Sequence, residues 1–274
     1  MNLSSKFEIV NISDVGRRRP HNEDSTLSDV DTGLVILADG MGGYKAGEVA
    51  SAIAVTTIHH EILTGLAELG QERNTTNASM TPESRVVRDA VITANSGIYT
   101  SAQKDPQCQG MGTTIVAVLF YNNSMTIAHV GDSRLYRLRA NEFLQITKDH
   151  SLIQELIDRG LYTPEEAVKN TPKNLVTRAL GIEADVKVDI GEQPVLPGDI
   201  FLLCSDGLND MVDDEEIHLT LSKYSANLVQ AAEELIRLAN AKGGKDNTSV
   251  ILIRAKEDFS ASGGPLKKLI SRFF

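Results

Sequence analysis

Residues 33–40 read GLVILADG, in which five consecutive apolar residues are followed by an acidic residue and a glycine. A second stretch, DIFLLCSDG (199–207), has the same form. A half-exposed strand alternates apolar and polar residues, whereas an uninterrupted apolar run fits a strand that is covered on both faces. These two stretches therefore predict central strands that lie between another sheet and a layer of helices.

The remaining patterns surround these strands with further strands and with two pairs of helices. Two β-rich runs on either side of Asn122-Asn123 predict a hairpin over 113–132, and a similar hairpin over 134–147 is predicted around Ala140-Asn141. Because the helices come in consecutive pairs and do not alternate with strands, we predict an α+β fold with four αββα layers, a central β-sandwich of antiparallel sheets flanked by helical pairs. The other predicted strands are 6–16, 186–191 and 247–255, and the predicted helices are 46–69, 83–103, 213–221 and 227–243.

The composition excludes several classes of protein. The 274 residues carry a formal net charge of −10, and broad nucleic-acid binding normally needs a basic face, so no nucleic-acid partner is expected. The two cysteines, Cys108 and Cys204, lie outside any CxxC pair, which excludes a zinc ribbon, a disulfide framework and a thioredoxin-like centre. No apolar run approaches the roughly 20 residues of a membrane span. The N-terminus also lacks the pattern of a signal peptide, so we expect a cytoplasmic protein.

Acidic residues recur at the ends of the predicted strands, and strands that end at one edge of the sandwich would bring them together. Carboxylates that converge without matching Lys or Arg repel one another, and such a cluster normally holds cations. No His or Cys is interleaved, so the ligands are all oxygen, which favours Mg²⁺ or Mn²⁺ over zinc. Taken singly, each Asp-Gly pair is also typical of a turn. The acids are Glu23, Asp24, Asp39, Asp132, Asp206 and Asp246.

The glycines and arginines beside these acids extend the interpretation. Gly40 and Gly207 would let the backbone approach an ion closely. Two hard cations can lower the pKa of a water molecule and direct it at phosphorus, and an arginine of the triplet 17–19 can grip phosphate oxygens. The pattern therefore indicates metal-dependent hydrolysis of a phosphoester, without naming the phosphoester.

At this level of detail the chain resembles the metal-dependent serine/threonine protein phosphatases of the PP2C (PPM) family, in its bacterial form. Each short motif is weak by itself, but six of them in the right order over about residues 7–255 are specific. The matching segments are Arg19-x-x-Asn22-Glu23-Asp24, Ala38-Asp39-Gly40-Met41-Gly42-Gly43, Gly112-Thr113-Thr114, Gly131-Asp132-Ser133-Arg134, Ser205-Asp206-Gly207 and Asp246-Asn247.

The resemblance implies a role for each matching residue. Asp39 would bridge two core ions, Mn²⁺ or Mg²⁺, with the Gly40 carbonyl on one of them, while Asp206 and Asp246 would hold the other. Glu23 would orient the attacking water, and Arg19 would bind the substrate phosphate. A third, weaker ion would be held by Asp132, Asp206 and Asp210, of which the last two are spaced by one helical turn.

The resemblance leaves the general acid open. Many eukaryotic members carry a histidine directly after the Asp-Gly of the second motif, and that histidine is thought to protonate the leaving group. Here the position is Met41, which cannot donate a proton. His21 lies within the first motif and is an alternative donor, and a metal-bound water is another.

The same resemblance divides the chain and suggests its partners. Residues 1–258 would form one phosphatase domain with a flap over 148–180, although that segment also fits a plain surface connection. The substrates would be phosphoproteins, and the enzyme would oppose a serine/threonine kinase. The alternatives are an inactive homologue that binds phosphoproteins and a metal phosphoesterase that acts on small molecules.

Residues 259–274 lie beyond the resemblance and read as a linker followed by a basic amphipathic tail. Leu266, Ile270, Phe273 and Phe274 fall on one helical stripe, with basic residues on other faces. Such a tail can dock on an anionic membrane surface or in a partner's groove, or it can lie against the domain itself. The basic residues are Lys267, Lys268 and Arg272.

Overall fold

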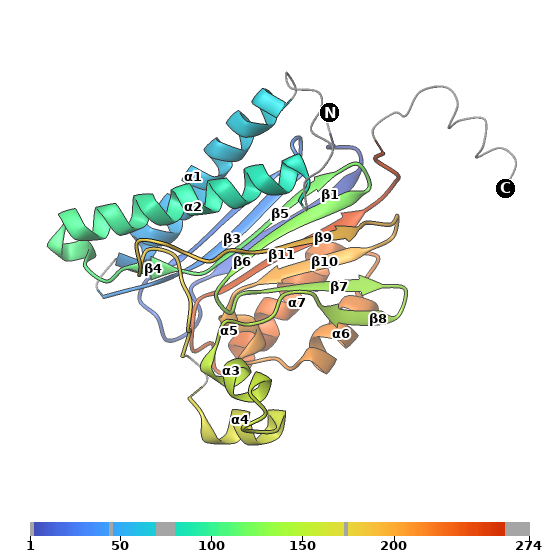
Figure 1. Ribbon diagram of the computed structural model, residues 1–274. Coiled ribbons are helices and arrows are strands. Elements are labelled where there is room, and N and C mark those ends of the chain that lie inside the picture. Colours follow the sequence, from blue (N-terminus) through green and yellow to red (C-terminus); the bar gives the residue numbers. More distant parts are fainter. Residues whose placement is uncertain (1–2, 44–45, 70–79, 173–174, 261–274) are drawn as a thin grey trace, which may run out of the picture.

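The computed structural model describes residues 3–43, 46–69, 80–172 and 175–260, and it contains two antiparallel sheets that face each other (Figure 1). The first sheet has the order β1 (Phe7–Asp14), β11 (Thr248–Ala255), β10 (Ile200–Cys204), β7 (Arg134–Arg139) and β8 (Glu142–Gln145). The second has the order β2 (Asp24–Asp29), β3 (Leu34–Met41), β5 (Ile115–Tyr121), β6 (Ser124–Val130) and β9 (Asp189–Pro194), and the short β4 (Gly112–Thr113) pairs with β3.

Each outer face of the sandwich is covered by a pair of helices (Figure 1). Helices α1 (Ala46–Leu69) and α2 (Pro82–Lys104) cover the second sheet, and α6 (Asp214–Lys223) and α7 (Leu228–Ala241) cover the first. The predicted αββα order of four layers is therefore confirmed.

The core explains why the central strands are apolar without interruption. Along β3, Val35 and Leu37 point into the layer between the sheets, whereas Leu34 and Ile36 point toward α1 and α2. All four are fully buried, because successive side chains of a strand point to opposite faces and both faces are covered here. Strand β11 divides its apolar residues between the inter-sheet layer and the α6–α7 layer in the same way.

Helix α1 is long and apolar enough, by length and composition, to cross a membrane, which differs from our expectation for this sequence. Its buried face, which includes Ala50, Ala54, Ile58 and Ile62, belongs to the same core cluster as α2 and β3. We therefore interpret α1 as a core helix of the domain.

Several short elements escaped the sequence patterns. Strand β2, DSTLSD, is polar because it is an edge strand that pairs only with β3. The flap contains two helices, α3 (Leu152–Asp158) and α4 (Pro164–Asn170), and they project from one end of the sandwich (Figure 1). The remaining short elements are α5 (Asp206–Asn209) and the 3₁₀ turn η1 (Pro106–Cys108).

The C-terminal limit of the folded core lies slightly beyond our proposed boundary at residue 258. Phe259 is 3% exposed, and its ring lies 5.0 Å from that of Phe7 between the sheets. The tail prediction concerns residues 261–274, which lie outside the described part of the chain.

Candidate active site

Five of the six acids predicted to converge, all but Asp24, line one pocket of about 260 Å³ at an edge of the sandwich. The turn after β6 contributes Asp132, and the end of β10 leads into Asp206. Seven of the eight residues predicted for the site line this pocket, and the eighth, Asp210, lies one turn along α5 from Asp206. The described lining is Arg19, Glu23, Asp39, Gly40, Met41, Gly42, Thr114, Asp132, Val176, Asp206 and Asp246.

The backbone of Asp39 is fixed by the strand beside it. Its carbonyl accepts from the Thr114 amide and from Thr113 Oγ1, both at 2.8 Å. The Asp39 amide in turn donates to Thr114 Oγ1 at 3.2 Å. The Gly-Thr-Thr motif therefore serves to hold Asp39 at the end of its strand.

A buried asparagine ties the first motif to the last. Asn247 is 4% exposed, and its side-chain amide donates to the carbonyls of Val15 and His21 at 2.9 Å each. Its Oδ1 accepts from the Glu23 amide at 2.8 Å. One side chain thus places the loop that carries Arg19 and Glu23 next to Asp246.

Gly40 and Gly207 have a role in the packing of the backbone, in addition to the approach to an ion that we expect. A Cβ at Gly40 would lie 2.1 Å from the Gly47 carbonyl oxygen, and one at Gly207 would lie 2.0 Å from that of Asn247. The space beside each glycine is therefore filled by another backbone segment, and both residues are required for close backbone contact within the fold.

Burial and mutual repulsion dominate the electrostatics of the pocket. Burial, followed by the charges of Asp24 and Asp206, raises the pKa of Asp39 well above its usual range. Burial likewise raises the pKa of Asp206, with the charges of Asp132 and Asp246 adding to the effect. The pKa of Asp132 is raised to about 6, mainly by burial. Ionised carboxylates are unstable together here unless positive charge is supplied.

Arg19 supplies part of that charge. Its Nη2 donates to Asp246 Oδ2 at 2.6 Å, and both side chains remain partly exposed. The same guanidinium opposes the effect of burial on Glu23, whose pKa is nevertheless raised. Arg19 is thus the cationic group of the described pocket lining.

Asp24 interacts with this cluster, as the position of the acids predicted, although the family resemblance gave it no individual role. Its Oδ2 accepts from Ser205 Oγ at 2.9 Å and from Ser249 Oγ at 2.6 Å, and burial raises its pKa to about 6. Its Oδ1 is buried without a hydrogen-bond partner among the described residues. The available signal was its position in the Glu-Asp pair at the start of β2.

Asp132 and Asp210 extend the pocket toward α5. The Asp210 amide donates to the Asp206 carbonyl at 2.8 Å, so the predicted helical turn does join these residues. The charges of Asp149 and Asp210 both add to the raised pKa of Asp132. These acids therefore interact electrostatically, as a shared cation site would require.

The donor set fits hard divalent cations. It consists of carboxylate and carbonyl oxygens, and its acids raise one another's pKa values. Within the described ranges, no three His, Cys, Asp or Glu side chains form a closed ligand group. The carboxylates thus line a shared pocket and do not form a tight cage.

Two further expectations concern residues at the rim. Met41 lines the pocket, whereas His21 does not belong to its described lining, and the backbone carbonyl of His21 is held by Asn247. Val176, from the C-terminal part of the flap, does line the pocket, and it is bridged to Ser151. The flap therefore borders the site.

Known proteins resemble this chain over most of its length. The serine/threonine phosphatase stp of Listeria welshimeri is 39% identical over 246 residues, which cover 88% of this chain and 93% of the relative. The solved structure of the Mycobacterium tuberculosis serine/threonine phosphatase PstP/Ppp has a TM-score of 0.80 and 36% identity, with coverage of 92% and 99%. A structure of the PstP catalytic domain in complex with two manganese ions has a TM-score of 0.75 and 37% identity, with the same coverage. The profile of protein phosphatase 2C matches residues 17–243, and the chain belongs to that family.

Proposed function

We propose that this protein is a metal-dependent phosphatase that hydrolyses phosphoserine and phosphothreonine in proteins. The observation that carries this conclusion is the pocket in which Asp39, Asp206 and Asp246 lie together beside the Arg19 guanidinium. That arrangement combines an oxygen donor set for divalent cations with a group that binds phosphate. Membership of the family and the two manganese ions of the PstP complex agree with it.

We assign the metal-binding roles to the residues of this pocket. Asp39 and the Gly40 carbonyl would hold one ion, and Asp39, Asp206 and Asp246 would hold a second. Asp132, Asp206 and Asp210 would hold a third, weaker ion. When bound, Mn²⁺ or Mg²⁺ supplies a water of lowered pKa and neutralises charge on the phosphate.

The side chains of the chain itself bind and orient the reactants. Arg19 binds two phosphate oxygens as a fork, and it must exchange its contact with Asp246 to do so. Glu23 accepts a hydrogen bond from the attacking water and orients it toward phosphorus. Because Met41 has no proton to give and the described pocket lining contains no histidine, we assign protonation of the leaving group to water.

The wider assignment follows from this chemistry. We infer one phosphatase domain that spans the described chain to Phe259, with residues 148–180 as a flap beside the pocket. A phosphatase of this specificity acts against a serine/threonine kinase, and we place the phosphatase in the cytoplasm.

The decisive experiment is hydrolysis of a phosphothreonine peptide and of p-nitrophenyl phosphate with Mn²⁺, with and without a chelator. We expect Asp39→Asn and Asp206→Asn to lose at least about two orders of magnitude in turnover, because each removes charge from the metal-binding set. Activity within about tenfold of the wild type in either variant would contradict the two-metal assignment.

The same assay, with nucleotides as a third substrate, separates the alternatives. An inactive homologue that only binds phosphoproteins would show no metal-dependent turnover on either substrate. A small-molecule phosphoesterase would prefer nucleotides to the phosphothreonine peptide. We expect the peptide to be preferred, since Arg19 and the flap lie at an open rim that a protein segment can reach.

A further inference from the structure

A second pocket, of about 630 Å³, lies at the opposite end of the second sheet from the candidate active site. The active-site pocket includes Thr114, just before β5, whereas this one is lined by residues 119–122 at the end of β5. We call it the apolar pocket. Its described lining is Leu3, Asp31, Thr32, Leu63, Leu66, Ala67, Glu83, Leu119, Phe120, Tyr121 and Asn122.

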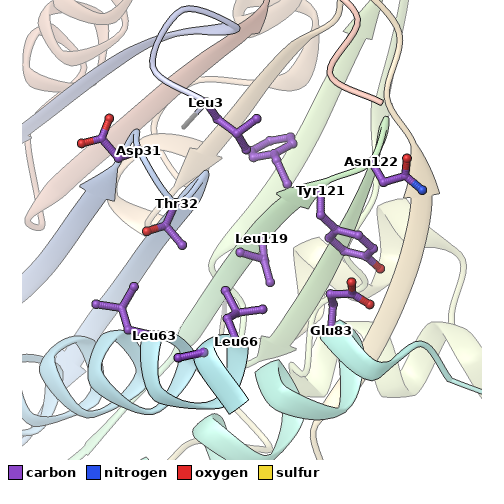
Figure 2. Close-up of a pocket in the computed structure, with 11 residues that line it drawn as sticks. Leu3, Asp31, Thr32, Leu63, Leu66, Glu83, Leu119, Tyr121 and Asn122 are labelled. Atoms are coloured by element: carbon purple, nitrogen blue, oxygen red, sulfur yellow. The ribbon is translucent and has the colours of Figure 1, made fainter. Parts of the chain in front are cut away.

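The interior of this pocket is apolar and its sides carry negative charge. Figure 2 shows Leu63, Leu66 and Leu119 directed into the space, with the carboxylates of Asp31 and Glu83 on opposite sides of it. A cavity of about 150 Å³ can hold a benzene ring, so this volume has room for more than one large side chain. The pocket therefore suits an occupant that is both apolar and basic.

The described chain ends beside this pocket. Asn123, at the tip of the β5–β6 hairpin, donates through Nδ2 to Asp258 Oδ2 at 2.6 Å, and its Oδ1 accepts from the Phe259 amide at 2.7 Å. The preceding residue, Asn122, lines the pocket. Figure 1 shows the last described residues running alongside that hairpin tip. The C-terminal segment thus leaves the domain next to the pocket's rim.

The sequence of that segment matches the pocket in both polarity and charge. Residues 265–274, PLKKLISRFF, contain five large apolar side chains and three basic ones. The chain's net charge of −10 includes these three cations, so residues 1–260 carry −13. Two other segments outside the described residues adjoin the pocket lining. Residues 70–79 read GQERNTTNAS and have no large apolar side chain, and residues 1–2, next to Leu3, have one apolar side chain, Met1, and no basic side chain.

We propose that residues 265–274 fold back in the same molecule and place their apolar side chains in the apolar pocket. The spacer 261–264 is four residues long and spans up to about 14 Å when extended, so the segment starts within reach. A short flexible spacer gives an effective concentration of millimolar order. Even an intrinsic dissociation constant of about 0.1 mM would therefore leave roughly nine tenths of the molecules docked. Lys267, Lys268 and Arg272 then lie near the carboxylates of the pocket.

This proposal is independent of the proposed catalytic function. The two pockets lie at opposite ends of β5, so docking of the tail is expected to leave hydrolysis of a small phosphoester unchanged. The sequence allows the tail to dock on a membrane, in a partner's groove or on the domain itself. The proposal selects the domain, because a tail held in the pocket is not free to insert into a membrane.

The chain contains no tryptophan, which makes the test direct. Phe273→Trp and Phe274→Trp, made separately in the full-length protein, each introduce a single fluorescent reporter. We expect at least one of them to show blue-shifted emission and shielding from acrylamide at all protein concentrations. Adding Leu63→Glu, which places a charge in the pocket, is expected to remove the shift and raise the quenching constant several-fold.

The matched control is Ile92→Glu on α2. Ile92 is 40% exposed, as Leu63 is 39% exposed, but it lies outside the pocket lining, so the reporter should stay shielded. Circular dichroism melting verifies that each variant is folded, and Ala67→Glu, at a second exposed lining position, replaces Leu63→Glu if that variant does not fold.

Four results would overturn the proposal. Both reporters could be as exposed as free tryptophan, or their shielding could survive both Leu63→Glu and Ala67→Glu, which would place the tail elsewhere. Shielding that increases with protein concentration would indicate a second copy of the chain as the host. Shielding that arises only with anionic phospholipid vesicles would indicate a membrane surface.

Discussion

Asp24 and Asp39 are direct partners across the antiparallel strands β2 and β3, with Asp24 in the first position of its strand. This register brings two acids from different motifs together at the edge of the sheet. The charge of Asp24 adds to the raised pKa of both Asp39 and Asp206, whereas a hydrogen bond with Asp39 lowers the pKa of Asp24 in part. The ionised acids of the site therefore repel one another in the folded protein, and bound cations would relieve this repulsion.

The first prediction is that Asp24→Asn stabilises the metal-free protein and weakens metal-dependent activity. The pKa of Asp24 rises from 3.8 to about 6, so the neutral side chain should add up to about 3 kcal/mol to the free energy of unfolding in chelator at pH 7.5. Activity at limiting Mn²⁺ should fall about 10- to 100-fold. Urea denaturation and a Mn²⁺ titration measure the two effects.

The control is Asp185→Asn, which neutralises an exposed acid that is not part of the active-site pocket. It should change neither the free energy of unfolding in chelator nor the activity at limiting Mn²⁺. Unchanged stability of Asp24→Asn in chelator would contradict the repulsion inferred from the register.

The second prediction concerns pH. The pKa values of Asp24 and Asp132 are raised to about 6, so the folded state binds more protons than the unfolded state between pH 6 and about 3.8. Stability in chelator must therefore increase as the pH falls from 7.5 to 5, by about 1.4 kcal/mol for each group. His129 opposes this by about 2 kcal/mol, because burial lowers its pKa to about 3 and its protonation favours the unfolded state. His150, whose pKa is also lowered by burial, opposes it in the same direction.

Asp39 and Asp206 add to the increase in stability at low pH, since their pKa values are raised further still. We thus expect a higher melting temperature at pH 5 than at pH 7.5 in chelator. With saturating Mn²⁺ the trend should vanish or reverse, because protons then compete with the metal. A melting temperature in chelator that falls from pH 7.5 to 5 would rule out the repulsive cluster.

The third prediction is that Arg19→Ala raises the KM for phosphate monoesters more than it lowers kcat. Arg19 lies at a partly exposed rim, where it can bind phosphate before the reaction starts. Steady-state kinetics on p-nitrophenyl phosphate measure both constants, and Arg18→Ala, at the exposed neighbouring position, is the control. A normal KM with a collapsed kcat would make Arg19 a group that acts only in the transition state.

The fourth prediction is that Asn247→Ala destabilises the protein by about 2–4 kcal/mol and lowers activity. The substitution leaves the carbonyls of Val15 and His21 and the amide of Glu23 without their buried partner. The free energy of unfolding, measured by denaturation, and the turnover should decrease together. Asn141→Ala, at an exposed turn, should change neither. Full activity in Asn247→Ala would show that the first motif is positioned by other contacts.

The fifth prediction is that neither cysteine takes part in catalysis. Burial raises the pKa of Cys204 to about 12, so its thiol stays protonated, and Cys108 lies outside the active-site pocket. Cys108→Ser should leave turnover unchanged. Cys204→Ser should lower the free energy of unfolding by about 1–3 kcal/mol, because it buries a hydroxyl, and should keep turnover. Loss of turnover in Cys108→Ser would require a covalent mechanism.

The sequence by itself determined the layers and the chemistry. The uninterrupted apolar runs of β3 and β10 required cover on both faces, and the acid after each run marked the edge where the acidic pocket lies. The hairpin turn could also be predicted from the sequence, because Asn122 and Asn123 adopt the positive φ angles that such a turn needs. These features depend on local patterns, which a linear chain displays directly.

Only the tertiary structure decided which residues support the site. Strand β2 has no apolar pattern because it is an edge strand, so the register that opposes Asp24 to Asp39 could not be read from it. The Asn247 contacts span more than 220 residues of chain, and the glycines at 40 and 207 are needed for backbone contacts across the fold. Each of these depends on distances between segments far apart in the sequence, which exist only after the two sheets have packed together.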